Sequence, residues 1–441
     1  MGAETFGGAV VIDLGLARGE PETYAAPTRS TVPAWLGPLI TALLVLWCAT
    51  ASAAPPPPVL SPLLNLPVGP ADSYLVTDAG QLLAQNLGGL SMYDLSSGRL
   101  RWRTEPAAPT YRLRMASGLV LLRPWSAGLT GVGDPGTTAV ALADGDARWR
   151  RTGNVVTLAG SGALLAVAGV RSLSGPGRRV EGSIDALDVV TGATRWRVQI
   201  PSTAVLLGVP ALGDVPPRML LVHDDRTAAV HDLTTGTRLT AATLPPADYG
   251  PDNPAVVGGL VLLRHPGTAG NVVSAYDAVT LTRRWTRPAG DAFEIRACGS
   301  LTCLVGPDGV RALDPVDGTQ RWYRPDWRGV EQRGAVMLAY AAPEGTIETV
   351  GLIDPATGRV LADLHGWRPL TGTGGGQRVV VTHAEQAGAR TMVAVAAPGD
   401  ARPRLLAVLP AGTGDCQAAP ARLVCRSTAG ELIVWAYRQK G

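Results

Sequence analysis

Residues that could carry catalytic chemistry are few and scattered in this chain of 441 residues. The five histidines show neither the HExxH nor the H-x-H spacing of a metal site; they are His223, His231, His265, His365 and His383. No Gly-x-Ser-x-Gly elbow is present to hold a serine nucleophile. The single lysine, Lys440, leaves no basis for Schiff-base catalysis. The sequence therefore assigns no catalytic residue and no metal ligand.

Three short segments have the composition of a binding site, but each has a plainer interpretation. His223-Asp224-Asp225 could bind a metal, and is expected to be a solvated turn between strands. Asp144-Gly145-Asp146 suggests calcium, but it lacks the spacing of a calcium-binding loop. The glycine run Thr371–Gly376 suggests phosphate binding, but no P-loop lysine accompanies it. We expect that run to be a flexible loop.

Four of the five cysteines form two local pairs, Cys298/Cys303 and Cys416/Cys425. Each pair flanks a predicted hairpin turn, and residues on paired antiparallel strands are close enough for a disulfide to join them. A four-cysteine zinc site is the alternative, but the close spacing of such sites is missing and the pairs fall in different parts of the chain. The sequence predicts two disulfides, which an exported location permits.

One unit recurs from about residue 70 onwards: an apolar-x-Asp, a turn that ends in Gly, and a Trp four residues later. MYDLSSGRLRW, ALDVVTGATRW and ALDPVDGTQRW are complete copies, whereas Leu281 replaces the glycine in one copy and Thr240 and Ala362 replace the tryptophan in two others. The residues that keep the pattern are Asp94, Gly98, Trp102, Gly145, Trp149, Asp188, Gly192, Trp196, Asp232, Gly236, Asp277, Trp285, Asp314, Gly318, Trp322, Asp354 and Gly358.

The spacing of the copies, about 43 residues, is that of a propeller blade of four short strands. We therefore predict an all-β fold: a β-propeller over residues 71–436, followed by a short tail at 437–441. In each blade the Asp-to-Gly hairpin precedes an outer strand whose Trp packs between blades. Eight passes can be traced from 71 to 410. A ninth blade would form if Val59–Pro67 supplied a fourth strand to the segment that follows residue 410. Propellers usually have four to eight blades, so eight is favoured and seven to nine are left open.

This unit resembles the tryptophan-docking repeat of the quinoprotein-like (PQQ-repeat) β-propellers. Ala186, Asp188, Gly192 and Trp196 match the pattern A-x-D-x-x-x-G-x-x-x-W in full, and the resemblance extends over roughly residues 60–436. It implies the propeller fold. It leaves the function open, because pyrroloquinoline-quinone (PQQ) dehydrogenases and non-enzymatic scaffolds of the bacterial envelope share the repeat. The chain looks like the membrane-anchored actinobacterial members, few of which have an assigned activity.

The dehydrogenases of this family hold PQQ on the propeller axis with a calcium or lanthanide ion and a catalytic Asp, and usually place a disulfide between adjacent cysteines against it. This chain has no adjacent cysteines. The favoured interpretation is therefore that it uses no cofactor, with PQQ and calcium as the alternative.

An uncharged stretch of 20 residues, Trp35–Ala54, precedes the repeats. As a helix it would measure about 30 Å, the thickness of the bilayer core, which predicts a transmembrane helix over 35–54. Arg18 and Arg29 precede it and no basic residue follows until Arg99, so residues 1–34 are expected to be a largely disordered cytoplasmic tail and the propeller to lie outside. A cleaved signal peptide is the alternative.

Two further features of the N-terminal part follow from the same interpretation. Cys48 is expected to be a membrane-buried thiol within the span. Residues 55–70 begin with four prolines and are predicted to be a stiff linker that contains the possible closing strand.

Composition narrows the function classes. Hydrophobic residues make up 46 % and charged residues 17 %, which excludes disorder as the main state, and the net charge of +3 is too balanced for nucleic-acid binding. We favour a non-catalytic, membrane-anchored binding or scaffold module of the bacterial cell envelope. A protein partner or small ligand would bind at the propeller funnel or at the loops 124–138, 171–182 and 246–254. A PQQ-dependent dehydrogenase or another propeller enzyme is the alternative.

Overall fold

The structure is a computed structural model, and it describes residues 33, 35–51, 59–70, 72–86, 89–105, 111–124, 136–158, 161–171, 177–250, 253–342, 345–372, 376–384 and 390–438. The chain divides into two compact units, Met1–Pro57 and Pro58–Gly441. Nearly all of the predicted tail 1–34, the four prolines and the side chain of Cys48 lie outside the described residues.

The described residues of the first unit contain one helix, α1 (Leu36–Ala51), of 16 residues. Its sequence contains no charged residue, and Pro38 lies in its first turn, where a missing N–H costs no helical hydrogen bond. The last residues of the predicted span, 52–54, lie outside the described residues. In the part of the chain that the structure describes, no helix is both long and apolar enough to cross a membrane.

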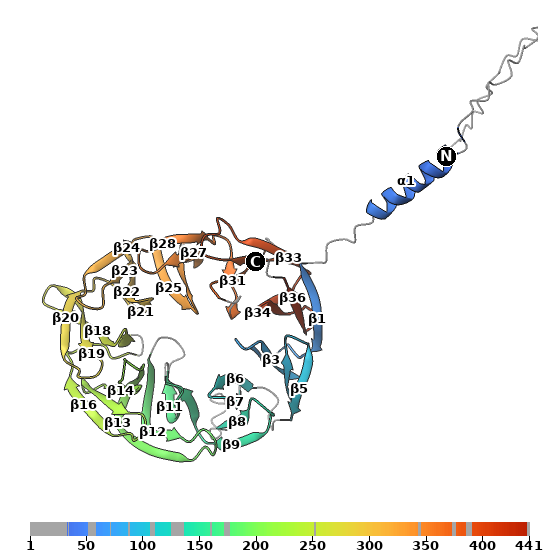
Figure 1. Ribbon diagram of the computed structural model, residues 1–441. Helices are drawn as coiled ribbons and strands as arrows, with labels where there is room; N and C mark the ends of the chain where they lie inside the picture. The colour runs from blue at the N-terminus through green and yellow to red at the C-terminus, as the bar shows by residue number, and fades with distance from the viewer. Residues whose placement is uncertain are drawn as a thin grey trace, which may run out of the picture. The chain divides into compact units, whose positions relative to one another are not determined.

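The second unit is a ring of four-stranded antiparallel blades that follow one another in chain order, with the fourth strand of each blade at the rim (Figure 1). Blades 1 to 3 consist of β2 (Tyr74–Val76), β3 (Gln81–Asn86), β4 (Gly89–Asp94) and β5 (Arg99–Thr104); β6 (Tyr111–Ala116), β7 (Leu119–Pro124), β8 (Thr137–Ala141) and β9 (Ala147–Arg151); and β10 (Asn154–Thr157), β11 (Leu164–Arg171), β12 (Arg178–Leu187) and the first part of β13 (Thr194–Val209).

Blades 4 to 6 consist of the second part of β13 with β14 (Arg218–His223), β15 (Thr227–Asp232) and β16 (Arg238–Thr243); β17 (Ala255–Val257), β18 (Leu260–Gly267), β19 (Gly270–Asp277) and β20 (Arg283–Pro288); and β21 (Glu294–Cys298), β22 (Leu301–Gly306), β23 (Gly309–Leu313) and β24 (Gln320–Arg324).

Blades 7 to 9 consist of β25 (Trp327–Arg333), β26 (Val336–Ala341), β27 (Glu348–Asp354) and β28 (Arg359–Asp363); β29 (Arg368–Pro369), β31 (Val379–Ala384), β32 (Thr391–Ala396) and β33 (Arg404–Leu409); and β34 (Gly414–Ala419), β35 (Arg422–Arg426), β36 (Glu431–Tyr437) and β1 (Leu60–Pro67), with β30 (Thr371–Gly372) beside β34.

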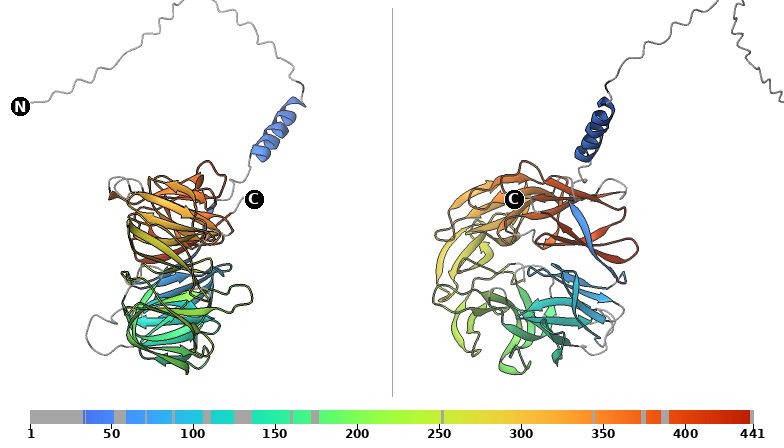
Figure 2. Two further views of the ribbon diagram at one scale, coloured as in Figure 1. Left: turned by 90° about the vertical axis from the view of Figure 1, so that its left-hand side faces the viewer. Right: turned by 45° about the vertical axis from the view of Figure 1, so that its right-hand side comes forward.

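The described residues thus form nine blades, one more than the favoured eight. Six sheets have four strands and one has five, and the seven-stranded sheet contains two blades joined by β13. The ninth blade is complete because β1 pairs antiparallel with β36, from Leu60 opposite Tyr437 to Pro67 opposite Glu431. Both ends of the second unit therefore contribute to one blade. Viewed edge-on, the ring is a disc one blade thick (Figure 2).

In the described residues, tryptophan and glycine of the repeat act as a pair across five of the blade boundaries. The Trp149 indole donates to the Val189 carbonyl of the next blade at 2.9 Å. A Cβ added to Gly192 would lie 2.5 Å from the Trp149 ring, so only glycine fits over it. Trp102, Trp196, Trp285 and Trp322 each make the same 2.9 Å bond to the following blade. The interpretation of tryptophan as packing is confirmed.

Both predicted disulfides are present. Cys298–Cys303 joins β21 to β22, and Cys416–Cys425 joins β34 to β35, with Cα atoms 5.7 and 4.1 Å apart. Each bond links the first and second strands of its blade, so the two occupy the same place in the repeat.

Candidate functional site

The loops of the ring fall into two sets, because consecutive strands of a blade are antiparallel. Loops between the second and third strands, and loops that lead to the next blade, leave one face, which we call the insert face. The Asp-to-Gly turns and the turns between first and second strands leave the opposite face, which we call the hairpin face. All three predicted contact loops, 124–138, 171–182 and 246–254, are on the insert face.

The loop before blade 5 shows how an inserted segment is held. Asn253 is 5 % exposed. Its side chain donates to the Arg264 carbonyl and accepts from the Arg264 N–H, both at 2.9 Å, so it pins the loop to β18. Asp248 of the same loop is exposed. Parts of all three inserted loops, at 125–135, 172–176 and 251–252, lie outside the described residues.

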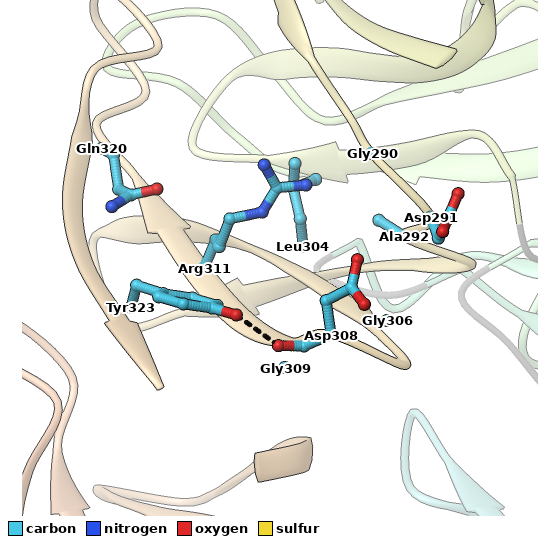
Figure 3. Close-up of a pocket in the computed structure, with 10 residues that line it drawn as sticks. All are labelled: Gly290, Asp291, Ala292, Leu304, Gly306, Asp308, Gly309, Arg311, Gln320 and Tyr323. Atoms are coloured by element: carbon cyan, nitrogen blue, oxygen red, sulfur yellow. Dashed lines mark hydrogen bonds between the residues drawn. The ribbon is translucent and has the colours of Figure 1, made fainter. Parts of the chain in front are cut away.

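A pocket of about 230 Å³ opens in blade 6 beneath the loop that enters that blade (Figure 3). Arg311 projects into it from β23 and donates to the Ala289 carbonyl. Asp291 and Asp308 contribute carboxylates at its mouth, and the Tyr323 hydroxyl donates to the Asp308 carbonyl at 2.5 Å. The charged side chains that line the pocket are two carboxylates and one guanidinium.

A second pocket, of about 330 Å³, lies at the matching place in blade 3. Asp185 on β12 is 5 % exposed and accepts two bonds from the Arg197 guanidinium, at 2.6 and 2.7 Å. Arg151, from the outer strand of blade 2, reaches the same carboxylate at 3.2 Å. The hydrogen bond from Arg197 lowers the pKa of Asp185 and, in return, raises the pKa of Arg197. Asp185 and Arg197 are therefore both charged at neutral pH.

The candidate segments from the sequence have structural roles. His223-Asp224-Asp225 begins the turn between β14 and β15, as expected, and Asp224 binds Arg179 at 2.7 Å. Burial lowers the pKa of His223. Asp144 pairs with Arg148 in the hairpin turn of blade 2.

The glycine run was expected to be a loop, and the structure corrects this for its first two residues. Thr371–Gly372 forms β30, which pairs parallel with Gln417–Ala418 of blade 9. A Cβ at Gly372 would meet the Ala418 carbonyl oxygen at 1.9 Å, so glycine permits the two backbones to approach. Residues 373–375 lie outside the described residues.

The histidines do not come together, since they lie in blades 4, 5 and 8 and in the loop between blades 7 and 8. His231 is 7 % exposed and bonds the Gly236 carbonyl at 3.0 Å, and His265 bonds Ser274 at 2.8 Å. Among the described residues, no group of three or more His, Cys, Asp or Glu side chains is placed to hold a metal ion.

PQQ with calcium is the group that the resemblance implies, and the residues that the structure describes do not fit it. The disulfides join residues five and nine positions apart, and Cys298 and Cys303 belong to an apolar core. On the innermost strands, Glu294 and Glu331 are each paired with an arginine, at 2.7 and 2.8 Å. We therefore derive no reaction step through PQQ.

Nine blades in the described residues, with tryptophan docking at five of their boundaries, define a β-propeller of the PQQ-repeat class. The family model described as outer membrane protein assembly factor BamB matches residues 46–231 and, a second time, residues 180–365. The two matches cover more than half of the 441 residues, so the chain belongs to this family.

Solved structures that match this chain have low sequence identity to it. BamB from Moraxella catarrhalis is 15 % identical with a TM-score of 0.38, over 86 % of this chain and 100 % of that chain. A quinohemoprotein alcohol dehydrogenase from Pseudomonas putida HK5 is 14 % identical with a TM-score of 0.37, over 64 % and 72 %. The C-terminal WD40 domain of Sif2 is 10 % identical with a TM-score of 0.44, over 87 % and 99 %. No curated protein matches the chain in sequence.

Sequence reasoning missed the group Arg151, Asp185 and Arg197. A comparison of equivalent positions in the copies of the repeat could have found Asp185 and Arg197. Asp185 lies three residues before a repeat aspartate and Arg197 directly follows a repeat tryptophan, and these two positions face each other in every copy that has the regular register.

Proposed function

We propose that this chain is a non-catalytic binding module of the bacterial cell envelope, in which a protein partner docks on the insert face. The observation that carries the proposal is that the three inserted loops and both described pockets share this face. Binding residues are commonly found on loops that a rigid scaffold positions, and the blades supply that scaffold. BamB, the protein for which the family is described, is an outer membrane protein assembly factor, a role that is in keeping with a protein partner here.

We further propose that the N-terminal segment anchors the propeller to the outer side of the cytoplasmic membrane. Helix α1 exposes Val45 and Trp47 by 64 % and 73 %, and it contains no charge that would favour water. A lipid environment would cover this apolar surface. Two disulfides in the propeller are in keeping with an oxidising compartment outside the cytoplasm.

Site-specific photo-crosslinking in the native cell tests the docking face. A photoreactive residue at Asp248, Asp308 or Asp326 on the insert face should crosslink to one and the same protein. Val190 and Val316, which are 71 % and 83 % exposed on the hairpin face, are the matched control positions. Crosslinks to that protein from the control positions alone would contradict the proposal.

Anchoring has its own test. The full-length chain should remain in the membrane fraction after alkaline carbonate washing, and replacement of Leu43 and Leu46 by Arg should release it, because charge at the centre of a span is costly. A reporter fused to the C-terminus should be active outside the cytoplasm and inactive inside. A soluble full-length chain, or a reporter active in the cytosol, would contradict the anchor.

The enzymatic alternative is separated by titrating the full-length chain with PQQ and calcium in a dye-linked alcohol or sugar assay. We expect neither saturable binding nor turnover. Turnover of an alcohol or a sugar would contradict the proposal of a binding module and would support a dehydrogenase.

A further inference from the structure

The pocket in blade 3 differs from the same place in the other blades. The strand register sets the residue three before each repeat aspartate opposite the residue that follows the tryptophan. In blade 4 these positions hold Ala229 and Ala241, and in blade 8 they hold Met392 and Val408. Among the eight described blades with this register, only blade 3 pairs an acid with a base there, Asp185 with Arg197. The fold therefore does not require charge at this place.

Arg151 also departs from its counterparts. The arginine two residues after a repeat tryptophan donates to a backbone carbonyl in the hairpin turn of the next blade in two other cases, Arg287 to Asp317 at 2.7 Å and Arg324 to Gly358 at 2.9 Å. Arg151 instead reaches the side chains of Asp185 and Thr194, at 3.2 and 2.8 Å. Arg151 therefore does not make the backbone bond that Arg287 and Arg324 make, and its side chain lines the pocket instead.

The two guanidiniums keep unused donors. Asp185 engages Nε and Nη2 of Arg197, and Asp185 with Thr194 engages Nη2 of Arg151. Nη1 of Arg197, and Nε and Nη1 of Arg151, donate to no residue in the described part of the chain. With two guanidiniums and one carboxylate, the pocket has a net charge of +1, and about 330 Å³ is at the lower end of the range for small-ligand sites.

We propose that the blade 3 pocket is an oxyanion site, in which Arg151 and Arg197 bind a carboxylate while Asp185 fixes both guanidiniums. The inference rests on the proposed function, since an acidic side chain of the docked partner would supply the carboxylate. One excess positive charge matches a carboxylate better than a phosphate dianion, and the planar guanidinium forms paired hydrogen bonds with carboxylate oxygens.

The test titrates the full-length chain with N-acetylglutamate by isothermal titration calorimetry at low ionic strength. N-acetylglutamine, of the same shape without the charge, and inorganic phosphate are the comparison probes. We expect saturable binding of N-acetylglutamate and none of N-acetylglutamine. Absence of saturable N-acetylglutamate binding would overturn the proposal, and tighter binding of phosphate would overturn the assignment to a carboxylate.

Two variants separate binding from structure because they should act in opposite directions. Arg151→Gln removes charged donors and should weaken N-acetylglutamate binding about tenfold or more. Asp185→Asn raises the net charge of the pocket to +2 and should tighten binding several-fold, provided that its circular dichroism matches the parent. Arg148→Gln is the matched control, because Arg148 lies on the same strand and pairs with Asp144 on the hairpin face.

A shift of both variants in the same direction would mean that the three charges only hold blades 2 and 3 together, and would overturn the proposal. The probes are free small molecules, so their binding does not depend on a partner. If N-acetylglutamate does not bind, the crosslinking test of the docking face is unaffected. If crosslinking fails, the titration still tests the oxyanion site.

Discussion

At the residue scale, the aspartate of the repeat is an acceptor for its own turn. One carboxylate oxygen of Asp277 accepts the backbone N–H groups of Val279 and Thr280 at 3.0 and 2.9 Å, and the other binds Arg284, the residue before Trp285, at 2.8 Å. These bonds favour the ionised form of the Asp277 carboxyl. They lower its pKa to about 2, and the hydrogen bond from Arg284 makes the largest contribution. The spacing in the repeat therefore reflects a fixed set of hydrogen bonds around one carboxylate.

Replacement of Asp277 by Asn should cost about 1 kcal/mol of unfolding free energy at pH 7, the usual net contribution of one hydrogen bond. Because the folded pKa lies below that of the unfolded chain, the contribution of Asp277 is complete above about pH 4 and is lost as the pH falls towards 2. Denaturant unfolding from pH 7 to 2 should therefore show a smaller acid loss in Asp277→Asn than in the parent. Asp326→Asn, at an exposed site without a described hydrogen bond, is the control. An equal acid loss in Asp277→Asn and the parent would contradict the role of the carboxylate.

At the element scale, five outer strands are joined to the next blade by tryptophan and glycine, and at one other boundary both residues are replaced together. Blade 4 has Thr240 where the tryptophan belongs, and blade 5 has Leu281 where the glycine belongs. Leu281 adopts a φ of 55°, keeps the turn bond to the Asp277 carbonyl at 2.8 Å, and packs into the core between these blades with 4 % exposure. Leucine thus fills the volume that an indole occupies elsewhere.

Gly192→Ala should destabilise the fold far more than Gly399→Ala. Both glycines have positive φ, +68° and +93°, so alanine at either position costs about 1–2 kcal/mol of backbone strain. Only at Gly192 would the new Cβ also meet an indole, 2.5 Å away, whereas nothing lies within 4 Å at Gly399. Chemical denaturation of the two variants measures the difference. Equal losses would show that the contact with Trp149 is unimportant.

A double-mutant cycle tests the paired exception. Leu281→Gly alone should cost about 2–5 kcal/mol by leaving a cavity, and Thr240→Trp alone should also destabilise, because Leu281 occupies the space for the ring. The double variant should recover much of the loss, which would give a favourable coupling energy. The reversed cycle, Trp322→Thr with Gly358→Leu, is the matched control at an intact boundary. Additive effects at both boundaries would argue against exchangeable packing.

At the scale of the whole propeller, closure depends on contacts between blade 9 and the start of blade 1. Arg426 donates to the carbonyls of Gly69 and Asp72, each at 2.7 Å, and its guanidinium lies 5.6 Å from the centre of the Tyr74 ring. Gln417 of blade 9 accepts from the Val76 N–H at 2.9 Å. These bonds join blades that are neighbours in space and distant in sequence.

Arg426→Gln should lower the free energy of unfolding by about 2–3 kcal/mol, since two partly buried carbonyls lose a charged donor. Arg324→Gln, which removes one bond to the Gly358 carbonyl between consecutive blades, should cost less. Hydrogen exchange should become faster in β1 and β36 of Arg426→Gln before it does elsewhere. Uniform exchange across all blades would contradict a weakened closure.

The fold was predictable from the sequence wherever the determinants are local. The repeat, the outer position of Trp196 and both disulfides follow from residues that are close in sequence. Completion of blade 9 was only an alternative, because Ser61 and Ala436, which face each other, are 375 residues apart. The blade 3 pocket was missed because Arg151 belongs to a different copy of the repeat from Asp185 and Arg197, and no periodic pattern reports a contact between copies.

The pairing of β1 with β36 also determines when folding can finish. Synthesis releases Leu60–Pro67 before any blade exists and Glu431–Tyr437 only after the other eight are complete. Strand β1 therefore has no pairing partner within its own chain until β36 has been synthesised. A chain interrupted before Glu431 would keep an open seam and an exposed strand edge, which quality-control proteases and chaperones can recognise.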